Sequence, residues 1–243
     1  MRNNITIGLV VPQASDIVPA EGPQMYPGVN FIARGVGVKA LTPQGYDGAW
    51  EGIVPAAEQL AKKGVDAIMV IGTSLTFYRG YEAHARLLER LREVTGLPVS
   101  TMSTAVVEGL RSIGARKIGV CTAYADEVNG RLRAFLTDSG FEVLALEGMG
   151  LEQFGAPSQK SEEDIIDLAG RVCAEAPGAE GLLISCGGLR TLAVGKTIED
   201  RYGVPVVSSM PAALWAALRL VGRSGGVAGY GKLLDPSRAA TVN

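Results

Sequence analysis

Short runs of apolar residues recur along the chain without the alternation that marks a half-exposed strand. The runs are Ile5–Val11, Ala67–Ile71, Ile118–Cys121, Gly181–Ser185 and Val204–Ser208. Each run ends near a turn or a cluster of small residues. Continuous apolar runs of this length are typical of strands that are buried on both faces, and such strands form parallel sheets.

Helix-like segments lie between these runs. The segment Tyr46–Lys63 carries apolar residues at helical spacing, as does Tyr81–Thr95, and a glycine follows each. A third segment, Ser161–Ala176, opens with a capping-box pattern in which Asp164 follows three residues after Ser161. Strands that alternate with helices predict an α/β fold in which helices cover the sheets.

The chain also contains an internal repeat. Three pairs of segments match in order, at offsets of about 107 to 114 residues. The pairs are Ile7–Val10 with Ile118–Cys121, Asp66–Gly72 with Glu180–Cys186, and Leu97–Ser103 with Val204–Met210. We therefore infer that two similar units follow one another in the sequence.

The repeat predicts two pseudo-symmetric lobes, each a mostly parallel sheet flanked by helices. We place the first lobe at residues 1–113 and the second at 114–220, and we expect the Gly-rich segment 221–243 to return to the first lobe or to be flexible. Ligands of such sheets bind beyond the carboxyl ends of the strands. The active site is therefore expected in the cleft between the lobes, with Gly72 and Cys186 at equivalent positions facing it.

Charge and cysteine content narrow the possible partners. The 243 residues include 23 Lys and Arg against 25 Asp and Glu, a formal net charge of −2, which gives no basic surface for nucleic acid or for a membrane. No apolar stretch approaches the roughly 20 residues that span a bilayer. Three cysteines do not make a disulfide framework. We expect a cytoplasmic protein that is a monomer and binds neither nucleic acid nor membrane.

Cys186 is the strongest candidate for chemistry. It follows the apolar run Leu182–Ile184 and precedes Gly187 and Gly188. Free backbone N–H groups at such a turn favour an anion and lower the pKa of a thiol, so we expect this sulfur to exchange protons near neutral pH. The alternative is a buried structural cysteine, which is the role we expect for Cys121 and Cys173.

Hydroxyl groups gather at other strand ends. Gly72-Thr73-Ser74 has the composition of an anion cradle, although an ordinary helix cap would have the same residues. Tyr124 could donate its phenol to the same anion or could simply pack as an aromatic ring. Ser103-Thr104 and Ser208-Ser209 add hydroxyls for which we expect capping roles. The single histidine, His84, lies among charged residues and is expected on the surface.

Several segments together resemble a known family. They are Gly72–Gly80 (Gly-Thr-Ser-x-x-Phe-Tyr-Arg-Gly), Thr101–Val106, Thr122–Tyr124, Ser185–Leu189, Phe31–Ala33, Thr42–Asp47 and Gly229–Gly231. In these segments the chain resembles the arylmalonate decarboxylase family of the Asp/Glu racemase superfamily. The resemblance spans nearly the whole chain and is weakest over residues 146–161.

The resemblance implies a carboxy-lyase that acts on a small dicarboxylate, a disubstituted arylmalonate, and needs no cofactor and no metal. One malonate carboxylate would lie in a hole formed by Thr73, Ser74, Tyr124 and the backbone N–H of Gly187. Cys186 would then deliver a proton to one face of an enediolate. The resemblance also implies that further residues form an apolar wall and a pocket for the aryl group. These residues are Pro12, Val38, Leu41, Tyr46, Leu75 and Gly188.

Two other functions stay open. Racemases and cis–trans isomerases of the same superfamily, such as maleate isomerases, use two cysteines, one from each lobe. Gly72 stands at the first of these positions and argues against a second acid–base group. A non-catalytic protein that binds small carboxylates would use the same hole without needing the Cys186 thiol.

Overall fold

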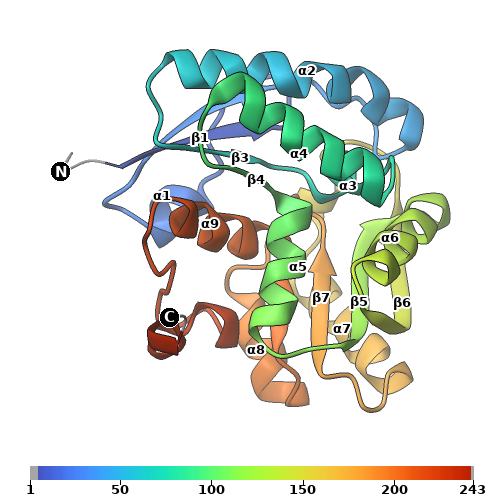
Figure 1. Cartoon of the computed structure of the whole chain (residues 1–243). Coiled ribbons are helices and arrows are strands. Elements are labelled where there is room, and N and C mark those ends of the chain that lie inside the picture. Colours follow the sequence, from blue (N-terminus) through green and yellow to red (C-terminus); the bar gives the residue numbers. More distant parts are fainter. Residues whose placement is uncertain (1–4, 242–243) are drawn as a thin grey trace.

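Two four-stranded parallel sheets form the centre of the protein (Figure 1). The computed structural model describes residues 5–241. The strand order is β2-β1-β3-β4 in the first sheet and β6-β5-β7-β8 in the second, and all neighbouring strands are parallel. The strands are β1 Thr6–Val11, β2 Asn30–Gly35, β3 Ala67–Val70, β4 Val99–Thr101, β5 Lys117–Tyr124, β6 Glu142–Leu151, β7 Gly181–Ser185 and β8 Val206–Ser208. The second sheet repeats the order of the first, which confirms the predicted α/β class and its pseudo-symmetry.

Helices connect successive strands and cover the sheets (Figure 1). Their bounds are α1 Glu21–Met25, α2 Pro43–Lys62, α3 Thr73–Phe77, α4 Tyr81–Thr95, α5 Met102–Ser112, α6 Asp126–Asp138, α7 Glu162–Glu175, α8 Val194–Tyr202 and α9 Ser209–Leu220, with short 3₁₀ turns at Ala156–Gln159, Lys232–Leu234 and Pro236–Thr241. The capping box of Ser161 and Asp164 forms at the start of α7 as predicted. Helix α2 begins earlier than Tyr46, because the Thr42 hydroxyl accepts a hydrogen bond from the N–H of Gly45 and Pro43 occupies the first turn.

The sequence pattern missed the edge strands β2 and β6. Each pairs with only one neighbour and has exposed or half-exposed positions interspersed with buried ones. A search for continuous apolar runs therefore passes over them. The run at residues 204–208 becomes a strand only from Val206 onwards.

Helices α5 and α9 join the lobes. Figure 1 shows them near the centre of the molecule, and they pack against each other. Helix α5 follows the last strand of the first sheet but also contacts β7 and β8, while α9 follows the last strand of the second sheet and contacts β3 and β4. Each helix thus contacts the other lobe's sheet. The division between residues 113 and 114 stays a prediction.

The segment after α9 contacts residues near the start and near the end of the first lobe's sequence. The Tyr26 hydroxyl donates a hydrogen bond of 2.6 Å to the carbonyl of Gly225, and Arg238 donates one of 2.7 Å to the carbonyl of Ser112. Residues 242–243, the end of the predicted segment 221–243, lie outside the described residues. Among residues 5–241, no helix combines the length and apolar character needed to cross a membrane.

The prediction of a surface position for His84 is wrong. Its side chain on α4 is buried, with Nε2 lying 2.7 Å from the Thr101 hydroxyl and 3.2 Å from the Thr104 hydroxyl, and its ring meets the ring of Phe135 edge to face. The charged neighbours that suggested exposure lie on the outer face of the helix. Burial lowers the pKa of His84 to about 4.

This burial makes the stability of the fold depend on pH. Because the unfolded histidine has a pKa of about 6.5, it takes up a proton before the folded one, so stability present above pH 6.5 is lost as the pH falls towards 4. We expect the contribution of His84 to the free energy of unfolding to fall by about 2 kcal/mol between pH 7 and pH 5. Urea unfolding of the wild type and of His84→Gln at both pH values measures it. Equal pH dependence in the two proteins would contradict a buried neutral imidazole.

Candidate active site

A cavity of about 330 Å³ lies where the carboxyl ends of strands from the two sheets face each other. Residues from both lobes line it. All eleven residues predicted for the site are among them: Pro12, Val38, Leu41, Tyr46, Thr73, Ser74, Leu75, Tyr124, Cys186, Gly187 and Gly188. The structure therefore brings the predicted set together in one place, while the role of each residue stays a prediction.

Equivalent turns after β3 and β7 carry Gly72 and Cys186. Gly72 has a φ of 113° and precedes α3. Cys186 has a φ of 152° and is the one residue other than glycine with positive φ in the described part of the chain. A side chain in this backbone region is strained and persists only where its surroundings hold it. The strain at Cys186 indicates that the thiol is held at this turn by the packing around it.

The hydroxyl of Ser209 connects the two turns. At the start of α9, it accepts a hydrogen bond of 2.8 Å from the Thr73 hydroxyl and one of 3.2 Å from the backbone N–H of Cys186. Ser209 is fully buried, and its own proton faces the carbonyl of Ile184 at 3.4 Å. Ser103, at the start of α5, donates to the carbonyl of Thr73 at 2.9 Å. These serines do more than the capping roles expected from the sequence, because Ser103 supports the Thr73 turn within the first lobe and Ser209 fixes that turn relative to the Cys186 turn of the second.

One wall of the cavity is rich in hydrogen-bond donors. The hydroxyls of Thr73 and Ser74 lie in the first turn of α3, where backbone N–H groups have no partner within the helix. The Tyr124 hydroxyl makes a long contact of 3.4 Å with Ser185 and interacts with Ser74 and Cys186. The buried Tyr46 hydroxyl has no partner of good geometry among the described residues, and Ser74 is its polar neighbour. Burial raises the pKa of both tyrosines, so both are neutral and can donate.

Apolar side chains also line the cavity. Val38, Leu41 and Leu75 are buried there, together with Ile71 and Met210, which the sequence reasoning did not identify. Ile71 and Met210 lie in the repeated segments, close to where their strands end. This position in the sequence could have identified them as lining residues.

A second group of unforeseen residues comes from the loop after β6. Phe154, Gly155, Pro157 and Ser158 line the cavity, in the region where the sequence resemblance is weakest. The loop reaches the first lobe through a hydrogen bond of 2.7 Å from the N–H of Leu41 to the carbonyl of Glu152, and Ala40 pairs with Gln153. These contacts hold the loop against the first lobe beside the cavity.

Formal charges are sparse around the cavity. Glu21 and Arg190 are the acidic and basic side chains among its described lining residues, and Arg190 is exposed. An anion inside would therefore be held mainly by hydroxyls and backbone N–H groups. The described residues contain no cluster of His, Cys, Asp and Glu that could hold a metal ion.

The expectation of a lowered thiol pKa at Cys186 is wrong. The side chain is 7% exposed, and burial raises its pKa. The N–H groups of Gly188 and Leu189 and the Tyr124 hydroxyl act in the opposite direction but do not outweigh burial. Cys186 therefore carries its proton at neutral pH and is suited to donate it.

The other two cysteines lie away from the cavity lining. Cys121 is fully buried in β5, and burial raises its pKa. Cys173 on α7 is partly buried, and burial raises its pKa as well. Their positions agree with the structural roles predicted for them.

Comparison of sequences identifies related enzymes. The family model described as arylmalonate decarboxylase matches residues 7–234. Arylmalonate decarboxylase of Bordetella bronchiseptica is 45% identical over 235 residues, covering 96% of this chain and 97% of that protein. Maleate isomerase of Nocardia farcinica is 25% identical and covers 98% of both chains.

Solved structures that resemble this one come from the same two kinds of enzyme as the related sequences. A crystal structure of arylmalonate decarboxylase in a liganded form, carrying a glycine-to-cysteine and a cysteine-to-serine substitution, superposes with a TM-score of 0.93 at 44% identity, over 95% of this chain and 99% of that chain. Maleate isomerase of Pseudomonas putida superposes with a TM-score of 0.89 at 21% identity and so shares the fold.

The raised pKa of Cys186 predicts how its alkylation depends on pH. Because only the thiolate reacts with iodoacetamide, the labelling rate at Cys186 should rise with a midpoint above the ordinary cysteine value of about 8.5. Mass spectrometry of the peptide that contains Cys186 measures the rate at each pH. The same cysteine in the urea-unfolded chain serves as the control and should show the ordinary midpoint. A midpoint near pH 7 in the folded protein would contradict the raised pKa.

Proposed function

This chain belongs to the arylmalonate decarboxylase family and is a decarboxylating enzyme, and we propose that it converts disubstituted arylmalonates to chiral monocarboxylic acids without a cofactor. The observation that carries the proposal is the asymmetry of the two equivalent turns. One turn presents the Cys186 thiol and the other presents Gly72, so the cavity has a single side chain suited to protonate a carbanion.

We assign the donor-rich wall to one carboxylate of the substrate. The hydroxyls of Ser74 and Tyr124 and the N–H of Gly187 converge on the cavity, and Thr73 joins them once its hydroxyl proton turns from Ser209 to the substrate. Arg190 is the basic side chain among the described lining residues, and because it is exposed it does not neutralise the anion fully. Donors that are already oriented stabilise charge that develops on the same oxygens in the transition state. As the carboxylate becomes an enediolate, its oxygens gain negative charge, and the hole becomes more favourable.

The apolar wall then favours loss of the second carboxylate. Val38, Leu41 and Leu75 offer it no hydrogen bond, and a carboxylate held against aliphatic side chains is poorly solvated. Release as neutral CO₂ removes that unfavourable contact. The bond between the α-carbon and the departing carboxylate breaks, and its electron pair stays on the α-carbon and delocalises into the bound carboxylate. An aryl substituent near Pro12 and Gly188 would delocalise it further.

Cys186 completes the reaction. Its S–H gives a proton to one face of the α-carbon, and the thiolate is reprotonated from solvent, so each turnover consumes one proton and releases one CO₂. The thiol pKa raised by burial keeps the donor protonated at neutral pH. The three groups that lower this pKa, two N–H groups and the Tyr124 hydroxyl, are placed to stabilise the thiolate once the proton has left.

Two alternatives remain distinguishable. A racemase or isomerase would need an acid–base group on the opposite face, where Gly72 has no side chain. A carboxylate-binding protein would keep its affinity without the thiol. We also propose that the enzyme acts as a cytoplasmic monomer on a small dicarboxylate and binds neither nucleic acid nor membrane.

Turnover of 2-methyl-2-phenylmalonate tests the proposal directly. Purified protein with EDTA and no added cofactor should release CO₂, raise the pH and form one enantiomer of 2-phenylpropionate. Cys186→Ser should lose turnover by about 10²-fold or more, since proton delivery by a positioned group contributes this much. A pH indicator follows the rate, and chiral chromatography identifies the product.

Cys173→Ser is a matched control. Cys173 is not among the residues that line the cavity, so this variant should keep wild-type turnover. Circular dichroism and binding of 2-phenylpropionate establish that Cys186→Ser is folded and keeps the carboxylate hole. Wild-type turnover in Cys186→Ser would refute the assigned role. No turnover by folded wild type would shift the assignment to an isomerase, a binding protein or a differently substituted malonate.

Gly72→Cys tests the asymmetry itself. A second thiol facing Cys186 should introduce exchange of the α-proton of 2-phenylpropionate in D₂O, and with it racemisation, which the wild type should not show. A β-carbon at this position would lie 3.2 Å from the Leu75 β-carbon, and the backbone φ is positive, so some local adjustment is needed. NMR measures the exchange and thermal unfolding checks the fold. A folded variant that binds the acid without exchanging its proton would refute the facing geometry.

A further inference from the structure

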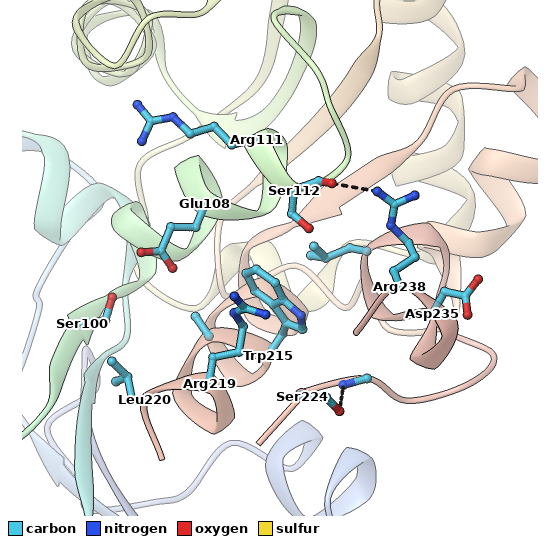
Figure 2. A pocket seen from close by; sticks show the side chains of 13 residues that line it. Ser100, Glu108, Arg111, Ser112, Trp215, Arg219, Leu220, Ser224, Asp235 and Arg238 are labelled. Carbon is cyan, nitrogen blue, oxygen red and sulfur yellow. Dashed lines mark hydrogen bonds between the residues drawn. The ribbon is translucent and has the colours of Figure 1, made fainter. Parts of the chain in front are cut away.

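A second cavity, of about 670 Å³, lies outside the active site between α5, α9 and the C-terminal segment (Figure 2). It shares no lining residue with the active-site cavity. Both helices begin at the active site, where Ser103 and Ser209 hold the Thr73 turn, whereas this cavity lies beside their later turns. It is thus a separate space, and nothing in the proposed reaction uses it.

An unsatisfied hydroxyl marks this cavity as polar. Ser100 in β4 is 5% exposed, lines the cavity, and has no hydrogen-bond partner for its hydroxyl among the described residues. Buried hydroxyls are nearly always paired, because an unpaired one costs free energy. Figure 2 shows the Ser100 side chain and the Glu108 carboxylate directed toward each other. The Ser100 hydroxyl and the Glu108 carboxylate are therefore both able to accept from a donor bound in the cavity.

Two opposite charges border the same cavity without a direct partner. Glu108 on α5 and Arg219 on α9 make no hydrogen bond or ion pair within the described part of the chain. Surrounding protein raises the pKa of Glu108 by desolvation, and Arg219, Arg111 and Arg92 attract its carboxylate only from longer range. The Arg219 guanidinium lies over the Trp215 ring, 4.8 Å from the ring centroid (Figure 2).

The other charged groups of the lining are engaged with the protein. Arg111 donates a hydrogen bond of 2.8 Å to the carbonyl of Ser139, and Arg238 donates one to the carbonyl of Ser112. Asp235 accepts from the N–H and the hydroxyl of Ser237. The charged groups of the described lining that are left for a ligand are therefore one carboxylate, Glu108, and one guanidinium, Arg219, and the buried Ser100 hydroxyl lies beside them in the lining.

We propose that this cavity binds a small zwitterion with an apolar side chain, an aliphatic α-amino acid. Its ammonium group donates to the Glu108 carboxylate and the Ser100 hydroxyl, and its carboxylate pairs with Arg219. The aliphatic side chain packs against apolar lining residues, namely Trp215, Leu220 and Leu233.

The charges of the cavity favour a zwitterion over simpler ligands. A lone anion at Arg219 would meet the Glu108 carboxylate and leave Ser100 and Glu108 without a donor. A lone cation at Glu108 would meet the Arg219 guanidinium. Because each charge of the cavity repels one of the simpler ligands, only a molecule with both charges satisfies both positions.

Three matched compounds test the proposal. L-leucine carries both charges, 4-methylpentanoate lacks the ammonium group, and 3-methylbutan-1-amine lacks the carboxylate. The variant Trp50→Phe leaves Trp215 as the single tryptophan of the chain, so its fluorescence reports on this cavity. We expect a saturable change with L-leucine and at least about tenfold weaker binding of the other two, because each lacks one charge-assisted contact.

Substitutions identify the contacts. In the same background, Ser100→Ala and Glu108→Gln should weaken L-leucine binding about tenfold while leaving 4-methylpentanoate unchanged or bound more tightly. Arg219→Gln should weaken both, and calorimetry replaces fluorescence for this variant because Arg219 contacts Trp215. Glu163→Gln, on the exposed first turn of α7, is the control and should change nothing. Thermal unfolding verifies that each variant is folded.

The binding results either support or overturn the zwitterion site. Preference for L-leucine that Glu108→Gln and Arg219→Gln abolish supports the zwitterion site. Equal responses to the three compounds, no saturable response up to tens of millimolar, or responses that these two variants leave unchanged would each overturn it. Both substituted side chains are exposed, so the test does not depend on the buried Ser100 tolerating replacement.

Discussion

The hydroxyl of Ser209 is the contact on which the arrangement of the active site depends. It lies at the start of a helix of the second lobe, and it accepts hydrogen bonds from the Thr73 hydroxyl of the first lobe and from the backbone N–H of Cys186. Because the group is fully buried, neither bond is exchanged for water. The positive φ of Cys186 is a strained conformation that needs such support. The Thr73 turn and the Cys186 thiol are thus held at a fixed separation.

The contact is possible because the lobes are joined by their last helices. Helix α5 packs against strands of the second sheet and α9 against strands of the first, so the two sheets cannot separate without disrupting a shared core. The starts of both helices carry the serines that hold the site. The loop after β6 closes the cavity from the remaining side through its contact at Leu41. The site is therefore built from elements that lie far apart in the sequence.

Pseudo-symmetry in the fold contrasts with asymmetry in the chemistry. The strand order of the two sheets is the same, and the turns after β3 and β7 are equivalent, yet one carries a thiol and the other no side chain. The lining of the cavity combines hydrogen-bond donors with aliphatic side chains. In the proposed reaction, this difference separates a carboxylate that is retained from one that leaves. The same burial that desolvates the leaving group also keeps the Cys186 thiol protonated.

The sequence by itself determined the parallel α/β class, the repeat and eleven of the residues that line the cavity, because buried strands and the turns after them have local signatures. Gly72-Thr73-Ser74 and Cys186-Gly187-Gly188 end apolar runs, and the strand-end rule brings them together. Only the tertiary structure decided the rest. Strands β2 and β6 lack a continuous apolar run, since their exposed and half-exposed positions impose none. The sequence does not show which face of α4 is buried, and only the packing of Phe135 against His84 reveals that this face is inside the protein. The pKa of the Cys186 thiol was mispredicted for the same reason. The local N–H groups that lower this pKa are visible in the sequence, whereas the burial that raises it is not.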